Sequence, residues 1–316
     1  EVWSETLPVF IRDQYVRPQH ADLLKIVGSP EEAVAFLKAK IDLTAEETKP
    51  ATASPIFLKL GGSLLTDKTA FEQVREDVLQ RVVQEIAKAR QFNPDLRLVL
   101  GHGSGSFGHA HASQHGTRQG VNSDAGWAGF AAVSDSALRL NRKVVKALMN
   151  AGIPAVSISP SASAVVKDGT VQYMATEPIS TALDAGLVPV IHGDVAFDQV
   201  RGGTILSTEE VMGYLVGRLK PSSILLAGET EGVYDAAGEV IPRITPDNFE
   251  KIKGALGGSR GADVTGGMAA KVQDVLNLAV AKPGMQVRIF GGLEPSVIHN
   301  LLINPKQHIG TVVEAV

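Results

Sequence analysis

Two glycine-rich stretches of this chain could bind phosphate, and each follows a short hydrophobic segment. The first is residues 59–63, "KLGGS", and the second is residues 98–115, "LVLGHGSGSFGHAHASQH". Free backbone N–H groups at a turn from a strand into a helix bind anions, and the helix dipole adds to this attraction. A third pair, Gly266-Gly267, precedes another helical segment. We therefore expect an anion site that is formed by several loops.

Each of these loops has a potential cation close by. Lys59 and Lys68 flank the first loop, His109 ends the second, and Lys271 lies in the first turn after the third. Three loops with three lysines would hold more than one phosphate, which suits phosphoryl transfer because that reaction depends on positioning and charge neutralisation. Taken singly, each loop could be an ordinary turn and each lysine a solvated surface charge.

The second loop also fits two other patterns. Residues 103–108 read G-x-G-x-x-G with an acid about 20 residues later, as in a dinucleotide site, but the residues before that acid do not form a strand pattern. His111 and His115 have the i, i+4 spacing of zinc ligands on a helix, yet no nearby glutamate or third ligand completes the set. We predict no metal site made by protein side chains, and we interpret His102 and His192 as interior residues.

Length and composition exclude several classes of protein. The chain has 316 residues, 44% of them hydrophobic, with a net charge of −4 and no cysteine. An isoelectric point near 6.1 gives no sign of nucleic-acid binding. No run of about 18 apolar residues exists to span a membrane, and the N-terminus lacks the basic and apolar regions of a signal peptide. We predict a cytoplasmic protein that acts on a small molecule.

Strands and helices are predicted to alternate from Pro55 onward. Residues 71–92 and 127–152 have helical periodicity. Short hydrophobic segments, most of which end in glycine, predict strands at 56–60, 96–100, 155–159, 188–193, 223–228 and 287–292. The alternation predicts an α/β fold, a three-layer αβα sandwich with a mostly parallel central sheet. Ligands of such sheets bind beyond the carboxyl ends of the strands.

Residues 1–52 are predicted to be an N-terminal extension and linker. Residues 29–41 begin with Ser-Pro and two acids and continue with helical spacing. A polar segment rich in Thr, Ala and Pro follows, as in a linker. We expect residues 53–316 to form the functional domain.

Taken in order, the motifs of this domain resemble the amino-acid-kinase superfamily. They are "IFLKLGGSLLTDK" from residue 56, "GHGSGSFGHAHA" from 101, "VIHGDVAFD" from 190, "EGVYD" from 231 and "DVTGGMAAKV" from 263. The histidine of "GSFGH" is characteristic of the isopentenyl phosphate kinase family and of the similar fosfomycin kinases. Residues 1–41 resemble the C-terminal tail of nucleoside-monophosphate phosphoribohydrolases that release cytokinin bases, which would make this segment a fusion remnant.

The resemblance implies that ATP, with Mg²⁺, phosphorylates isopentenyl phosphate to isopentenyl diphosphate in isoprenoid biosynthesis. It also implies a homodimer, an acceptor-binding half at about 53–200 and a nucleotide-binding half at about 201–316. The implied catalytic residues are Lys59, Lys68, His109, Asp194 and Lys271, with Asp194 orienting the lysines. The implied acceptor-binding residues are Gly62, Gly103, Ser104, Gly105, His109 and Gly193. The implied nucleotide-binding residues are Lys59, Gly61, Gly62, Ser63, Gly228, Gly232, Val233, Tyr234, Gly267, Met268 and Lys271.

Two stretches depart from the superfamily pattern. Residues 207–210 read "STEE" where "SGD" is common, and residues 228–234 read "GETEGVY" where "TDVDGVY" is common. Both stretches keep acidic side chains, but these side chains are longer. The resemblance therefore does not determine the contacts with the nucleotide and the metal.

The sequence also does not determine the apolar part of the acceptor site. Phe130, Val133 and Ala137 share a helix face and Ile158 follows on a strand, but all four could be ordinary core residues.

Three functions are compatible with the sequence. The first is the kinase of isopentenyl phosphate, and the second is a related kinase that acts on fosfomycin or on an amino-acid carboxylate. The third is a nucleotide-binding sensor without catalysis. His109 favours a phosphate or phosphonate over a carboxylate. The three lysines favour a catalyst, because a sensor does not need to stabilise a transition state.

Overall fold

The computed structural model describes residues 9, 12, 27–43, 53–67, 69–108, 115–255, 267–282 and 284–315. It divides into two compact units, Glu1–Thr52 and Ala53–Val316. In the first unit, helix α2 spans Pro30–Leu43 and has two acids in its first turn, in agreement with the helix predicted at 29–41. Every helix among the described residues is too short or too polar to cross a lipid bilayer.

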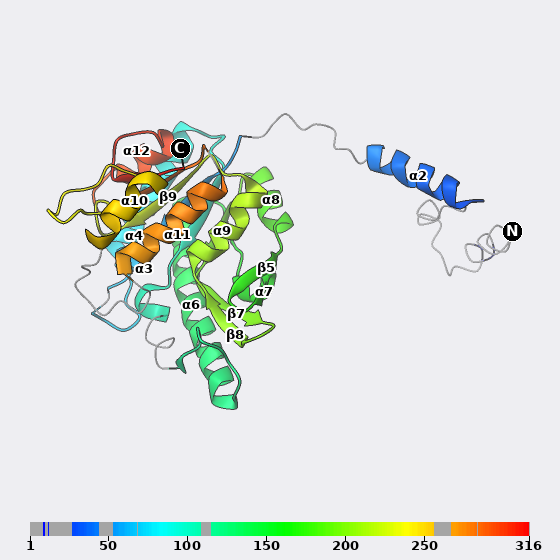
Figure 1. The fold of residues 1–316 in the computed structure, drawn as a ribbon, viewed down its shortest axis with the longest axis horizontal. Coiled ribbons are helices and arrows are strands. Elements are labelled where there is room, and N and C mark those ends of the chain that lie inside the picture. The colour runs from blue at the N-terminus through cyan, green and yellow to red at the C-terminus, as the bar shows by residue number, and fades with distance from the viewer. Residues whose placement is uncertain are drawn as a thin grey trace. The chain divides into compact units, whose positions relative to one another are not determined.

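The second unit is built on an eight-stranded sheet (Figure 1). The strand order is β10-β12-β11-β9-β1-β2-β6-β3, and all neighbours are parallel except β11 and β12. The strands are β1 (Ile56–Leu60), β2 (Leu98–His102), β3 (Ala155–Ser157), β6 (Val188–His192), β9 (Ser223–Gly228), β10 (Arg243–Ile244), β11 (Gln286–Gly291) and β12 (Thr311–Val313). The α/β fold with a mostly parallel sheet is therefore confirmed.

Helices cover both faces of this sheet, which gives the predicted three layers. The first layer consists of α4 (Glu76–Phe92), α6 (Asp124–Asn150) and α12 (Val297–Ile303). The second consists of α8 (Glu177–Asp184), α9 (Thr208–Leu219), α10 (Pro246–Ile252) and α11 (Gly267–Ala281). Because side chains of a strand alternate between faces, Leu58 of β1 joins the first core and Phe57 the second. The short helices are α3 (Gly62–Leu65), α7 (Pro160–Ser163) and the 3₁₀ turn η2 (Lys253–Ala255).

A second, four-stranded sheet was not predicted from the sequence. Its order is β5-β4-β7-β8, and it packs against α6 and α7. Its strands are β4 (Ala164–Lys167), β5 (Thr170–Met174), β7 (Asp194–Asp198) and β8 (Gly202–Leu206). A small apolar cluster of Val121, Phe130, Val133 and Val195 lies where α6 meets this sheet and is separate from both large cores.

Two predicted helices begin at different residues in the structure. The helix expected at 71–92 starts at Glu76, because the described residues of the segment 66–74, namely 66–67 and 69–74, form a loop whose ends are joined by a bridge between Thr66 and Val74. The helix expected at 127–152 starts at Asp124, where the hydroxyl of Ser123 accepts a hydrogen bond from the N–H of Gly126 at 3.2 Å. A serine at this position is a typical helix N-cap.

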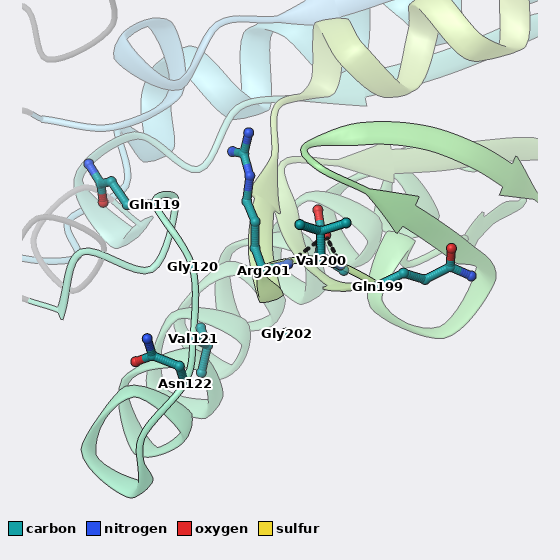
Figure 2. A pocket seen from close by; sticks show the side chains of 9 residues that line it. Gln119, Gly120, Val121, Asn122, Gln199, Val200, Arg201 and Gly202 are labelled. Atoms are coloured by element: carbon teal, nitrogen blue, oxygen red, sulfur yellow. Dashed lines mark hydrogen bonds between the residues drawn. The ribbon is translucent and has the colours of Figure 1, made fainter.

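The carboxylate of Asp198 holds the open end of the small sheet together. It accepts hydrogen bonds from four backbone N–H groups of two turns, at 2.7–3.0 Å: Asp168, Gly169, Val200 and Arg201. Burial would raise the pKa of Asp198, but the four donors outweigh it and lower the pKa to about 2. A cavity of about 740 Å³ adjoins this turn, between residues 119–122 and 198–202, and Figure 2 shows the side chains that line it.

We predict that Asp198→Asn destabilises the fold by about 2–3 kcal/mol, because hydrogen bonds to a charged acceptor are lost and an amide donor then faces other donors. The depressed pKa means that the contribution is complete above the unfolded value of about 3.9 and is lost as pH falls through about 2. Urea denaturation measures the difference.

The matched control is Asp168→Asn. It removes an exposed ion pair with Arg201 and keeps a residue type that tolerates the positive φ of 48° at this position. We expect a change below about 1 kcal/mol. Equal losses in the two variants would contradict the role given to Asp198.

Candidate functional site

Five parallel strands end in glycine loops at one edge of the large sheet. The loops are joined to one another by backbone hydrogen bonds of 2.8–3.1 Å, each from a glycine N–H to a carbonyl of a neighbouring strand end. The bonds run from Gly61 to Ala227, from Gly103 to Leu60, from Gly193 to His102 and from Gly292 to Gly228. The first two predicted phosphate-binding loops therefore lie side by side at the carboxyl edge of the sheet.

The first two glycine loops are in direct backbone contact. A Cβ atom on Gly62 would lie 2.4 Å from the nitrogen of Gly105, and one on Gly103 would lie 2.9 Å from the nitrogen of Gly62. Gly105 also has a φ of +49°, which residues other than glycine rarely adopt. Both loops therefore require glycine, and Ser104 lies between the two glycines of the second loop.

Thr66, which sequence reasoning missed, fastens these loops together. Its fully buried hydroxyl donates to the carbonyl of Gly62 at 2.8 Å and accepts the N–H of Ser106 at 2.9 Å. A hydroxyl can donate and accept at once, so one side chain joins the end of α3 to the second loop. The sequence signal was a threonine four residues after Gly62, which is the spacing of one helical turn.

Lys59 extends from β1 toward α9, on the same face of the sheet as Phe57. Its Nζ contacts the carboxylate of Glu209, and the two side chains are 16% and 32% exposed. Burial would raise the pKa of Glu209, but the charge of Lys59 outweighs it, Lys271 adds to the effect, and the pKa is lowered. The carboxylate of Glu209 therefore interacts electrostatically with two of the three predicted lysines.

The N-terminus of α9 orients Glu209. Ser207 and Glu210 form a capping box, in which Ser207 accepts the N–H of Glu210 and Glu210 accepts the N–H of Ser207. Glu210 also binds Arg118 at 2.9 Å, so the two adjacent acids of "STEE" face different partners. Glu209 is thus directed to Lys59 by the cap, and sequence reasoning did not assign it this contact.

Asp194, which was predicted to orient the lysines, lies at the start of the small sheet. Its buried carboxylate accepts the N–H of Ser161 at 3.2 Å and of Val195 at 2.8 Å, and it lies 3.5 Å from the hydroxyl of Ser134. Burial raises the pKa of Asp194 above the ordinary aspartate value. Among the described residues, the carboxylate that contacts Lys59 is that of Glu209, and the role of Asp194 toward the lysines stays a prediction.

His102 and His192 form a buried, stacked pair beneath the loops, with ring centroids 5.5 Å apart. His102 lies 3.1 Å from the carbonyl of Gly103 through Nδ1 and 3.1 Å from the amide of Asn141 through Nε2, which fits a neutral ring with its hydrogen on Nδ1. Neither ring nitrogen of His192 has a hydrogen-bond partner among the described residues. Burial lowers the pKa of His102 to about 3 and of His192 to about 4.

The segment at 228–234 follows β9 and carries four of the predicted nucleotide residues: Gly228, Gly232, Val233 and Tyr234. Val233 is fully buried, and its N–H donates to Thr311 Oγ1 at 2.8 Å. Tyr234 is 37% exposed. Farther along the chain, Gly267 and Met268 begin α11, and Lys271 is exposed one turn later. These residues lie on the side of the edge formed by β9 and β11.

Three predicted residues, Lys68, His109 and His111, lie outside the described residues. Ser63 lies in α3, directly after Gly62. Across the described ranges, His, Asp and Glu side chains form no group of three that could bind a metal ion.

The fold and this edge of glycine loops define a member of the amino acid kinase family, which the chain matches over residues 54–291, more than half of its length. Its relatives include the isopentenyl phosphate kinase of Methanocaldococcus jannaschii, 34% identical, with 78% of this chain and 94% of the relative covered. The isopentenyl phosphate kinase of Haloferax volcanii is 41% identical, with 75% and 92% covered. A solved isopentenyl phosphate kinase structure is similar at a TM-score of 0.68 and 28% identity, over 82% of this chain and 99% of that one.

Proposed function

We propose that this chain is an ATP-dependent kinase that transfers a phosphoryl group to isopentenyl phosphate. The observation that carries the proposal is the contact between the two glycine loops, next to Lys59 held by Glu209. Backbone amides of Gly103, Ser104 and Gly105 would bind the acceptor phosphate, and Gly193 borders the same loops. Lys59 would stabilise the charge of the transferring group, because phosphoryl transfer depends on positioned charges.

A phosphate acceptor needs no strong general base. The second pKa of a phosphate monoester is about 6, so its oxygen is already anionic at neutral pH. The two histidines beneath the loops are buried and uncharged at that pH. An alcohol acceptor would instead need a group to remove its proton. The site is therefore better suited to a phosphate than to an alcohol.

The nucleotide would lie on the side of β9 and β11. We assign its phosphates to Gly61, Gly62, Ser63 and Lys271, and the rest of the nucleotide to the segment at 228–234 with Gly267 and Met268. Mg²⁺ would neutralise charge on the bridging oxygens. Since the described residues offer no group of three metal ligands, ATP oxygens and water would hold most of its coordination sphere.

The apolar end of the acceptor fits the cluster between α6 and the small sheet. Phe130 and Val133 pack there with Val121 and Val195. Two aromatic rings border Phe130, with centroids 5.3 Å away for Trp127 and 5.2 Å away for Phe197. Of the other residues considered for this role, Ile158 packs against the second large core and Ala137 is buried farther along α6. The homodimer and the cytoplasmic location stay predictions.

The proposal predicts that ADP release is fastest with isopentenyl phosphate. A coupled assay should compare isopentenyl phosphate, dimethylallyl phosphate, fosfomycin and N-acetylglutamate at equal concentrations. We expect no turnover with N-acetylglutamate, because a carboxylate acceptor needs cations for its amino-acid group and makes no use of the phosphate cradle. Preferred turnover of fosfomycin would assign the chain to the related kinase, and no turnover with any acceptor would favour the sensor.

We predict that Lys59→Ala lowers kcat by about 10² or more, because one preorganised charge in a water-excluded site is worth roughly 3 kcal/mol.

We also predict that Glu209→Gln lowers kcat by roughly tenfold, since Lys59 loses the carboxylate that positions it. Glu210→Gln is the matched control, because glutamine preserves the capping box and Glu210 does not contact Lys59. A normal kcat in folded Lys59→Ala would remove Lys59 from the mechanism.

We predict that His109 donates a hydrogen bond to the acceptor phosphate. His109→Ala should lower kcat/KM by roughly 10–150-fold, the cost of about 1.5–3 kcal/mol for a lost bond to a charged partner. His109→Gln should lose less because it keeps a neutral donor. A protonated imidazole attracts the phosphate more strongly, so the alanine penalty should grow as pH falls toward 6. A tightly bound zinc that is lost from His109→Ala would show that His109 is a metal ligand instead.

A further inference from the structure

Glu72 has an unfavourable backbone conformation in the loop at 66–74. Its φ is +51°, and four residues other than glycine in the described chain have a positive φ. Two of the other three, Lys220 and Ser296, lie at helix ends, and Asp168 lies in a hairpin turn. A positive φ is costly for a side chain with a Cβ atom and persists only where surrounding contacts hold it.

The contacts that hold Glu72 come from α6. Ser136 Oγ donates to Glu72 Oε1 at 2.7 Å, and Arg139 Nε donates to Glu72 Oε2 at 3.1 Å. A second nitrogen of Arg139 contacts Oε1, so the guanidinium binds the carboxylate in a two-pronged arrangement. The carboxylate side chain is only 15% exposed. Arg139 is 44% exposed, so the ion pair lies at the surface, and the buried hydroxyl of Ser136 holds the carboxylate from the inner side.

Ser136 also connects Glu72 to the second glycine loop. The buried hydroxyl of Ser136 faces the carbonyl of Phe107 as well as Glu72, and a hydroxyl has one hydrogen to share between these two acceptors. At the base of the loop, Thr66 pairs with Val74 and bonds Ser106 through its hydroxyl. The Glu72 carboxylate thus fixes the loop at 66–74 to α6, and Ser136 of α6 joins it to the end of the second glycine loop.

We propose that Glu72 is a positioning residue for the phosphate acceptor. By anchoring both loops to α6, it would keep the phosphate cradle at a fixed distance from Phe130 and Val133, which lie on the same helix. This proposal rests on the proposed function of the site. The contacts described above lie on the acceptor side of the sheet edge, so Glu72 should affect acceptor binding and leave ATP binding largely unchanged.

The test is Glu72→Gln, which keeps the size of the side chain and an oxygen for Ser136 but removes the charge that pairs with Arg139. We expect the KM for isopentenyl phosphate to rise roughly tenfold, because small displacements of positioning groups have large effects. The KM for ATP should change less than about twofold. Amide hydrogen exchange should become faster at residues 66–74 and 104–107 in the variant.

Asp135→Asn is the matched control, since it removes the other carboxylate that contacts Arg139 and leaves Glu72 in place. It should change neither KM nor exchange at these residues. Equal rises in both KM values, or an unchanged KM for isopentenyl phosphate, would overturn the proposal. A wild-type protein that does not phosphorylate isopentenyl phosphate would contradict the proposed function instead. Exchange would then decide the role of Glu72, and unchanged rates in both segments would overturn it.

Discussion

The backbone contact between Gly62 and the loop at 103–105 is the constraint on which the site depends. Because the two loops touch without side chains between them, amides that follow β1 and β2 lie at the same edge of the sheet. Thr66 can join the loops only because they are this close. A single added methyl group at Gly62 would overlap the backbone of Gly105, so the geometry of two strands would have to change together.

The pairing of charged side chains in the site follows from the way successive side chains of β1 point to opposite faces of the sheet. Lys59 lies on the same face of the sheet as Phe57 and therefore extends toward α9, where the capping box directs Glu209 to it. Glu209 is longer than the aspartate that is common in this superfamily, and its carboxylate contacts Lys59. The carboxylate of Glu209 contacts Lys59 and also interacts electrostatically with Lys271, which offsets part of the positive charge of the site.

The sequence was sufficient to predict the parts of the structure that depend on local pattern. Short hydrophobic runs that end in glycine identified the central strands, and the loops were assigned to phosphate because backbone amides need no particular side chain. The partner of Lys59 was not predictable, since Glu209 lies 150 residues away along the chain and Asp194 fitted the resemblance equally well. The start of α4 was missed because helical periodicity continues through Glu72, whose positive φ is imposed by contacts with α6. The small sheet was missed because its strands are short and partly exposed.

The small apolar cluster at Val121, Phe130, Val133 and Val195 is separate from both large cores. Substitutions in it would change the volume and shape of that region without disturbing the packing that holds the central sheet. Under the proposed function, in which this cluster holds the apolar end of the acceptor, selection could alter the hydrocarbon group that is accepted while the phosphate chemistry stays intact. Because the apolar cluster is separate from the large cores, a few amino-acid changes in it could change the substrate while the glycine loops and Lys59 stay the same.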